Sequence, residues 1–325
     1  MIENMGGRET RPPSPPIGGS EPARGTRAGP RERDSFTGGR ETRPPSPPIG
    51  GSEPARGTRA GPRERDSFTG TETVTNVGGR ATRITRSGRG RPLLWLHDTT
   101  GNRWTPGHDA LVRHHEVIAP SLPGFDDSTT LTQIDRPEDL VFWLLDLWDA
   151  LSLERPALLG CGLGGWIAAE FAARYPERLG RLVLVDAYGL QVDGALAADE
   201  FALTPPMLRP LVFAEPEASL ARAWLPDVEP PERVESALHA RVAAARLTWQ
   251  FPYCPKLRGR LARAKVPALI LWGAQDRLVP PAHAHAYAQS LPDARVVVLS
   301  GAGHYPWLET PDRFAEEVER FLGEG

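Results

Sequence analysis

The segment LLGCGLGGWIAAEFAARYPERLG, residues 158–180, decides how the rest of the chain is interpreted. It joins a short apolar run to an alanine-rich stretch with helical spacing, and glycines stand at the junction. Gly160, Gly162 and Gly165 spell G-x-G-x-x-G, the pattern of a dinucleotide-binding turn. The same segment also fits the G-x-S-x-G nucleophile elbow, with Gly162 in the place of the serine. The first motif predicts a nucleotide site, and the second predicts a hydrolase scaffold without its nucleophile.

Apolar runs alternate with helical patterns along most of residues 71–325. Runs such as PLLWLH (92–97) show no polar alternation, which is typical of strands buried on both faces of a sheet. Two further stretches around Gly78-Gly79 predict a hairpin. Strands are predicted over 92–97, 115–119, 156–160, 181–186, 266–273 and 294–299, and helices over about 135–151, 164–175 and 312–322. This alternation predicts an α/β fold, a mostly parallel central sheet with helices on both faces.

The segment 187–262 interrupts the alternation. It contains several prolines, is helical in character (RVESALHARVAAARLTW) and has no strand signal. We interpret it as a helical cap inserted after the sixth strand. Such an insertion covers the carboxyl ends of the strands, where open α/β sheets bind their ligands.

The first 70 residues differ from the remainder. Residues 6–37 recur without a change as residues 38–69, and each copy holds six prolines and few large apolar side chains. Such a unit cannot bury enough apolar surface to offset the entropy of ordering it. The sequence therefore predicts two parts, a disordered Pro/Arg/Gly-rich tail over 1–70 and one α/β domain over 71–325.

The position of the glycine-rich turn favours the elbow over the dinucleotide motif. A dinucleotide fingerprint belongs in the first strand–helix turn of its domain, and here two predicted strands precede it. Asp186, at the end of the next strand, stands where a ribose-binding acid is expected, which keeps the dinucleotide alternative open. Downstream, however, Asp276 follows strand 266–273 and His304 follows strand 294–299. Nucleophile, acid and histidine then occur in the chain order of a hydrolase triad.

With these residues in order, residues 91–325 resemble the α/β-hydrolase superfamily, close to its esterase and carbon–carbon-bond hydrolase branches. The resemblance rests on PGF (123–125), GLGGWIAAEFAARYPERLGRLVLVD, LWGAQDRLVPP and GAGHYPWLETP, which match the family in order and spacing. It implies the α/β-hydrolase fold. It also implies that Asp276 orients His304, that His304 is the general base, and that the backbone N–H of Leu163 is one oxyanion donor. A residue of the segment LHDTTG (96–101) would supply the other donor.

Three departures from the family pattern fall in the region of this site. Gly162 offers no hydroxyl for His304 to activate. The oxyanion segment has His97-Asp98 where the family usually has His-Gly, and the loop PGFDDS has Asp126 where the family usually has glycine. A carboxylate near the oxyanion hole would oppose acyl transfer. Cys161 is expected to be a small buried side chain rather than a substitute nucleophile.

Three functions remain open. In the interpretation we favour, the protein is a pseudoenzyme or strongly impaired hydrolase whose capped pocket binds a small, mostly apolar molecule. Alternatively, the Asp276–His304 pair activates a water bound at Gly162, giving an active hydrolase or a lyase. A dinucleotide-binding protein is the remote third alternative.

The composition limits the partners. The formal net charge is −3, and no apolar stretch is long enough to span a bilayer, so neither nucleic acid nor a membrane is expected as a partner. Two cysteines, Cys161 and Cys254, give no disulfide framework, and the first residues, MIENMGGRE, lack the apolar region of a signal peptide, so we expect a cytoplasmic protein. His283 and His285 alternate, but we expect them on a solvated surface. No cofactor and no metal are predicted.

Overall fold

A computed structural model describes residues 70–126, 128, 131–248 and 252–324. The predicted tail, residues 1–70, lies outside the described residues except for Gly70 and stays a prediction. The domain predicted over 71–325 contains nearly all of the described chain.

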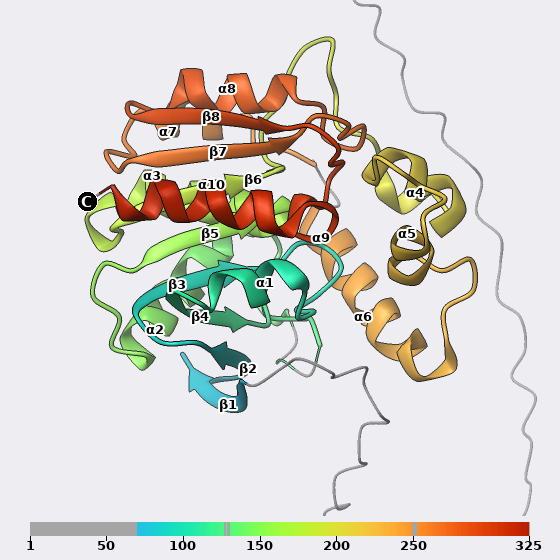
Figure 1. Ribbon diagram of the computed structural model, residues 1–325. Helices are drawn as coiled ribbons and strands as arrows, with labels where there is room; N and C mark the ends of the chain where they lie inside the picture. The colour runs from blue at the N-terminus through green and yellow to red at the C-terminus, as the bar shows by residue number, and fades with distance from the viewer. Residues whose placement is uncertain (1–69, 127, 129–130, 249–251, 325) are drawn as a thin grey trace, which may run out of the picture. The chain divides into compact units, whose positions relative to one another are not determined.

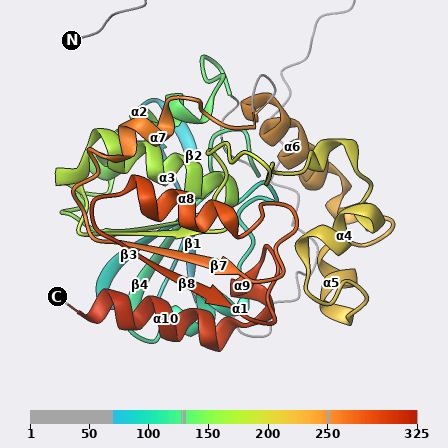
Figure 2. The same cartoon turned by 90° about the horizontal axis from the view of Figure 1, so that it is seen from above.

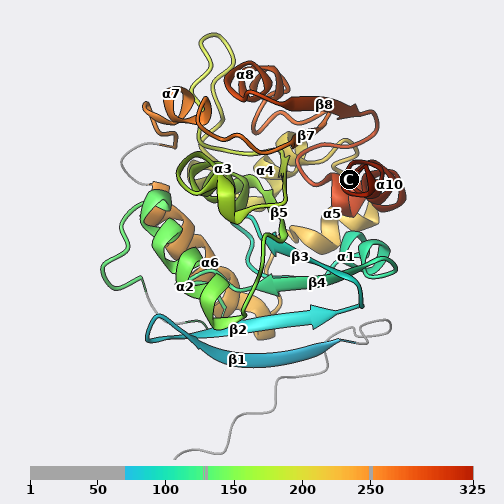
Figure 3. The same ribbon diagram turned by 90° about the vertical axis from the view of Figure 1, so that its left-hand side faces the viewer.

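The described part of the chain folds around an eight-stranded sheet with the order β1-β2-β4-β3-β5-β6-β7-β8. The first two strand pairs, β1–β2 and β2–β4, are antiparallel, and all other pairs are parallel. Figure 3 shows the hairpin at one edge of the sheet and β8 at the other. The strands are β1 (Thr71–Val77), β2 (Arg80–Ser87), β3 (Arg91–Leu96), β4 (His115–Pro120), β5 (Ala157–Cys161), β6 (Arg181–Val185), β7 (Ala268–Gly273) and β8 (Ala294–Leu299).

The apolar runs predict these strands within about two residues, because a central parallel strand is buried on both faces. All six residues of β7 are buried, for example. At the hairpin, Gly78 and Gly79 have φ values of +56° and +83°, a conformation that glycine adopts without steric cost.

Helices cover both faces of the sheet (Figure 2). On one face lie α2 (Leu140–Ala150), α3 (Gly162–Arg174) and α8 (Ala282–Ser290), and on the other lie α1 (Pro106–Leu111) and α10 (Pro311–Gly323). The predicted helix at 135–151 begins as a 3-10 turn, η1 (Pro137–Asp139). A second 3-10 turn, η2 (Pro176–Arg178), follows α3, and α9 (Pro306–Glu309) precedes α10. The sequence analysis missed α1 and α9, which are six and four residues long.

The inserted segment forms η3 (Glu200–Ala202), α4 (Pro205–Val212), α5 (Ser219–Trp224), α6 (Pro231–Thr248) and α7 (Leu257–Leu261). Figure 1 shows α4, α5 and α6 beside the end of the sheet at which β7 and β8 finish. Helix α7 instead packs against α3 and α8, so it belongs to the layer that covers the sheet. The cap helices are therefore α4–α6, and the inserted segment predicted over 187–262 returns to the sheet layer before α7.

Helix α3 is buried on all sides, unlike the amphipathic α10. Its position between the sheet, α2 and α7 requires apolar or small residues on every face. Glu170, the acidic residue of this helix, is fully buried and forms ion pairs with Arg174 and Arg260. No helix in the described ranges is both long and apolar enough to cross a membrane.

Candidate active site

The glycines of the opening segment form a sharp turn between β5 and α3. Gly162 is the first residue of α3 and has a φ of +50°. A Cβ atom at Gly160 would lie 2.3 Å from the backbone oxygen of Gly164, and a Cβ at Gly164 would lie 2.4 Å from that of Leu96. Both positions therefore require glycine. The backbone N–H of Gly164 also donates to the carbonyl of His97 at 3.1 Å, which ties the turn to the loop after β3.

Gly162 faces the histidine at the end of β8. A Cβ atom built on Gly162 would lie 3.3 Å from Nε2 of His304, 2.9 Å from Cβ of Asp98 and 3.5 Å from Cε2 of Tyr188. A side chain at this position would thus point to the free nitrogen of the imidazole. It would also meet the side chain of Asp98 at less than an ordinary carbon–carbon contact distance.

Asp276 and His304 form a buried hydrogen-bonded pair. Asp276 Oδ2 lies 2.8 Å from Nδ1 of His304, and Asp276 Oδ1 accepts from the backbone N–H groups of Leu278 and Val279 at 2.9 Å each. Because the carboxylate accepts only, Nδ1 carries the proton and Nε2 faces Gly162. Burial alone would lower the pKa of His304, but the carboxylates of Asp276, Asp98 and Glu200 raise it above its ordinary value.

Asp98 points into the site. Its Oδ1 accepts from the backbone N–H of Thr100 at 2.5 Å, while Oδ2 lies 3.9 Å from Nε2 of His304. Neither Oδ2 nor that Nε2 has a hydrogen-bond partner, and both side chains are buried. His97 supports the loop instead: its Nδ1 donates to the carbonyl of Asp98 at 2.6 Å, and its Nε2 accepts from the backbone N–H of Leu122 at 2.9 Å.

Asp126 has a different role from Asp98. One carboxylate oxygen accepts from the backbone N–H of Asn102 at 3.1 Å and from the hydroxyl of Ser121 at 2.8 Å. These bonds fasten the loop after β3 to the loop after β4. The structure therefore brings only one of the two additional carboxylates against the imidazole.

Two further carboxyl groups lie near the pair and were not predicted as site residues. Asp186 follows β6, accepts from the backbone N–H of Gly273 at 2.9 Å and is fully buried. Burial, followed by the neighbouring carboxylate of Asp276, raises the pKa of Asp186 well above its ordinary value. Asp186 is thus enclosed between the backbone of Gly273 and Asp276, which does not fit the ribose-binding role that the dinucleotide alternative gave it.

The second unpredicted group, Glu200, comes from the inserted segment. Tyr188 donates its hydroxyl proton to Oε1 of Glu200 at 3.0 Å, and Thr99 donates to Oε2 at 3.0 Å. Burial, followed by the negative charge of Asp98, raises the pKa of Glu200 to about 7, while the hydrogen bonds from Tyr188 and Thr99 lower it. Glu200 therefore joins the inserted segment to the loop that carries Asp98.

Aromatic side chains surround the imidazole. The rings of Tyr188 and Tyr305 lie 5.6 and 5.3 Å from the ring of His304, and Trp224 of α5 lies 6.0 Å from Tyr305. The guanidinium of Arg103 stacks 3.5 Å above the ring of Trp224. Of the other bulky apolar residues of the inserted segment, Leu208 and Phe213 are buried and Met207 is exposed.

Leu163, the expected oxyanion donor, stands second in α3, where a backbone N–H has no partner within the helix.

Cys161 is buried, and burial raises the pKa of its thiol well above the ordinary value, which suits the predicted packing role. The expectation for His283 was wrong: it is buried, and its Nε2 lies 2.7 Å from the carbonyl of Ala195. His285 is exposed, as expected.

Two groups of side chains in the described residues bring three metal-ligand atoms within 4.8 Å of one another, Asp186–Asp276–His304 and Glu138–Glu170–Cys254. In the first group, the facing atoms of Asp276 and His304 are already hydrogen-bonded to each other. In the second, Glu170 is neutralised by two arginines. Neither arrangement requires an ion.

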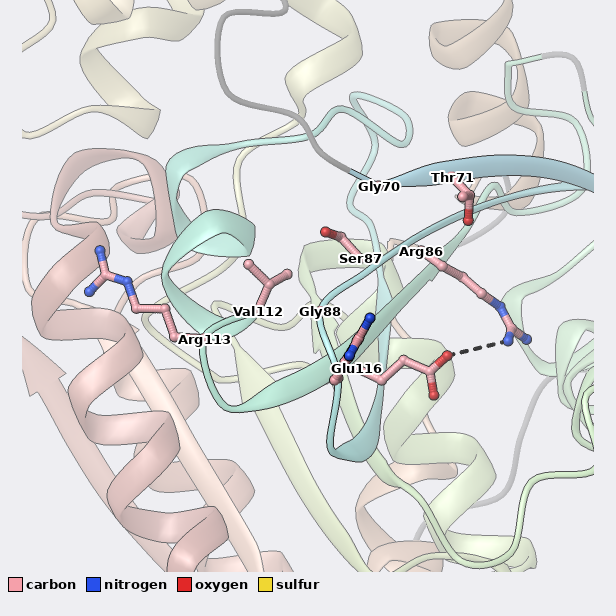
Figure 4. A pocket seen from close by; sticks show the side chains of 9 residues that line it. Gly70, Thr71, Arg86, Ser87, Gly88, Val112, Arg113 and Glu116 are labelled. Atoms are coloured by element: carbon pink, nitrogen blue, oxygen red, sulfur yellow. Dashed lines mark hydrogen bonds and ion pairs between the residues drawn. The ribbon is translucent and has the colours of Figure 1, made fainter.

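An open hollow of about 720 Å³ lies far from this site, at the amino ends of β3 and β4 (Figure 4). Arg86 and Glu116, which line it, form an ion pair at 3.4 Å. Its lining includes none of the residues around His304.

The family model described as "Alpha/beta hydrolase family" matches residues 87–317. The chain therefore belongs to the α/β-hydrolase family. The sheet order also differs from the 3-2-1-4-5-6 order of the dinucleotide-binding fold, so the dinucleotide alternative is set aside.

Among curated relatives, an uncharacterized protein of Mycobacterium bovis is 30% identical over 268 residues, covering 75% of this chain and 78% of the relative. The 2-hydroxy-6-oxo-6-phenylhexa-2,4-dienoate hydrolase of Comamonas testosteroni is 31% identical over 233 residues, covering 64% of this chain and 77% of the relative. The pimeloyl-[acyl-carrier protein] methyl ester esterase of Aeromonas hydrophila is 29% identical over 261 residues, covering 74% of this chain and 98% of the relative. The chain thus resembles both esterases and carbon–carbon-bond hydrolases.

Solved structures agree on the fold. A serine hydrolase involved in carbazole degradation has a TM-score of 0.65 at 23% identity, covering 78% of this chain and 99% of that one. A meta-cleavage product hydrolase from Pseudomonas fluorescens has a TM-score of 0.64 at 22% identity, covering 78% and 97%.

Proposed function

We propose that this chain binds a small, mostly apolar molecule in its capped site and has lost the covalent chemistry of serine hydrolases. One observation carries the proposal. The Asp98 side chain takes up the space beside Gly162, with its Cβ 2.9 Å from where a Cβ of residue 162 would lie. Gly162 itself has no hydroxyl, so His304 has no nucleophile to activate at this position.

Charge supports the same conclusion. Acyl transfer develops negative charge on an oxyanion, which the Leu163 N–H would be expected to stabilise. In this site the Asp98 carboxylate lies within 4 Å of the imidazole. A like charge about 4 Å from an oxyanion opposes it by about 4 kcal/mol at an effective dielectric of about 20.

The aromatic surroundings favour an apolar ligand. Tyr188, Tyr305 and Trp224 provide a large apolar surface next to His304. One relative is named for a substrate that carries a phenyl group, which agrees with a site of this character.

A second candidate function rests on the preserved Asp276–His304 hydrogen bond of 2.8 Å. A water beside Gly162 could give its proton to Nε2 of His304, which would make the chain a hydrolase or a lyase without a covalent intermediate. Because Asp276, Asp98 and Glu200 raise the pKa of His304, Nε2 can accept this proton only at a pH above that raised pKa.

The test combines hydrolysis and binding. We expect the wild type to release p-nitrophenol from p-nitrophenyl butyrate no faster than buffer does, and to bind phenethyl alcohol in a calorimetric titration. Turnover by the wild type that disappears in His304→Ala would establish the second candidate instead. Absence of binding would contradict the proposed ligand class.

A further inference from the structure

Two buried polar atoms of the site face each other without partners. Oδ2 of Asp98 and Nε2 of His304 are 3.9 Å apart, which is too long for a hydrogen bond between them. Asp98 is 2% exposed and His304 is 0% exposed. Leaving such atoms unpaired is costly, so the pair is expected to accept a group that satisfies both.

The chemistry of that group follows from the protonation of the pair. Nδ1 of His304 donates a hydrogen bond to Asp276, so Nε2 is a hydrogen-bond acceptor when the imidazole is neutral. Oδ2 of the Asp98 carboxylate is an acceptor as well. A single atom can serve both only if it carries at least two hydrogens. A water molecule and a primary ammonium group both meet this requirement, but only the ammonium also compensates the charge of the buried carboxylate.

We propose that the ligand of this site is a primary amine with an apolar tail, whose ammonium group donates to Oδ2 of Asp98 and to Nε2 of His304. The inference rests on the proposed function, because it names the chemical class of the molecule that the capped site binds. The tail would lie against the aromatic side chains that surround the imidazole.

Acidic groups reach the imidazole from several elements. Asp98 comes from the loop after β3, Asp276 from the loop after β7 and Glu200 from η3. Asp186, after β6, lies beside Asp276, and burial followed by the charge of Asp276 raises its pKa well above the ordinary value. The groups facing His304 therefore favour a cation over an anion.

Arg103, a basic side chain close to the aromatic residues of the site, is already engaged. Arg103 donates from Nη1 to the carbonyl of Trp224 at 3.3 Å and stacks on the ring of the same residue. Burial, followed by the charge of Arg233, lowers the pKa of Arg103 to about 10, so its guanidinium remains charged at neutral pH. The aromatic faces of Tyr188 and Tyr305 add an attraction for a cation near His304.

The amine competes with a proton for Nε2. Protonation of His304 places a hydrogen and a positive charge where the ammonium would bind. Amine affinity should therefore rise with pH, by up to tenfold per pH unit below the pKa of His304, as one proton is released on binding. Phenethylamine remains protonated over this range, so its own charge does not change.

The experiment compares phenethylamine with phenethyl alcohol, its neutral analogue, by calorimetry on the full chain. At pH 8 we expect the amine to bind about 10- to 100-fold more tightly, the factor that corresponds to a hydrogen bond with a charged group. Asp98→Asn should remove this preference, because it removes the charge that the ammonium compensates and that the neutral alcohol does not need. Asp293→Asn removes the same charge at an exposed residue directly before β8, at the other end of the sheet, and should keep the preference.

The outcomes separate the two proposals. Binding of the alcohol without tighter binding of the amine would overturn the inference and leave the proposed function standing. Failure of both molecules to bind would overturn both. The pH series needs only the wild type, so it remains decisive if Asp98→Asn does not fold: an amine affinity that stays constant or falls from pH 5 to pH 8 would also overturn the inference.

Discussion

The space beside the elbow can hold one side chain, either at residue 98 or at residue 162, and this leads to a double-variant prediction. In Gly162→Ser alone, the new Cβ would meet Cβ of Asp98 at 2.9 Å, and the serine would adopt a φ of +50°. The overpacking costs about 1–3 kcal/mol and the left-handed backbone about 1–2 kcal/mol. Asp98→Gly removes the opposing Cβ together with the carboxylate.

The expected difference in rate between the single and the double variant comes from the charge of the Asp98 carboxylate. The Asp98 carboxylate lies 3.9 Å from Nε2 of His304, and an oxyanion that formed at a similar distance from this carboxylate would be opposed by about 4 kcal/mol at an effective dielectric of about 20. Each 1.36 kcal/mol corresponds to tenfold in rate, so the double variant Asp98→Gly/Gly162→Ser should exceed Gly162→Ser by about 10³-fold.

The assay is release of p-nitrophenol from p-nitrophenyl butyrate by the wild type, both single variants and the double variant. We expect turnover in the double variant that disappears when His304→Ala is added. The reasoning fails if Gly162→Ser alone is as active as the double variant, because Asp98 then neither fills the space nor opposes the charge.

Three further outcomes are expected. Gly164→Ala should destabilise the fold by about 3 kcal/mol or more in urea unfolding, because the new Cβ would lie 2.4 Å from the backbone oxygen of Leu96. Gly259→Ala, at an exposed helical position with open space around it, should instead stabilise the fold by up to about 1 kcal/mol. Equal effects of the two substitutions would contradict the close approach of Gly164 to the backbone of Leu96. Glu200 has a pKa raised from 4.5 to about 7, so its contribution to stability is complete below pH 4.5 and is lost as the pH rises through 7. Glu200→Gln should therefore show a smaller fall in the urea midpoint between pH 5 and pH 8 than the wild type, and an unchanged fall would be inconsistent with a buried carboxyl group. Asp276→Asn should lower the pKa of His304 in an NMR titration, since the largest of the interactions that raise it is lost. A pKa that stays in place would show that this hydrogen bond is not formed in solution.

The sequence predicts the sheet well because its central strands are short, continuous apolar runs bounded by Pro, Gly or charged residues. Asp276 and His304 were found for a related reason. Each follows a clear strand, and the carboxyl ends of parallel strands meet at one edge of the sheet.

The direction of the Asp98 side chain could not be predicted. It depends on the conformation of the loop after β3, where one carboxylate oxygen accepts from Thr100 and the other is left facing His304. Glu200 gave no signal at all, since it lies in an irregular segment 101 residues after Thr99, its partner in the loop. The burial of His283 could not be predicted either, because its ring contacts the carbonyl of Ala195, which belongs to the inserted segment.

The burial of Asp98 and His304 has a consequence for how fast ligands bind and leave. With the two side chains 2% and 0% exposed, a molecule can reach the imidazole only after the segments that cover it move, and we expect the cap to be the one that opens. Association should then be slower than the roughly 10⁵–10⁷ M⁻¹s⁻¹ that is usual for preformed sites, and the observed rate should level off at high ligand concentration. The apparent affinity is reduced by the fraction of molecules that are open, so residence time will report on the cap as much as on the ligand.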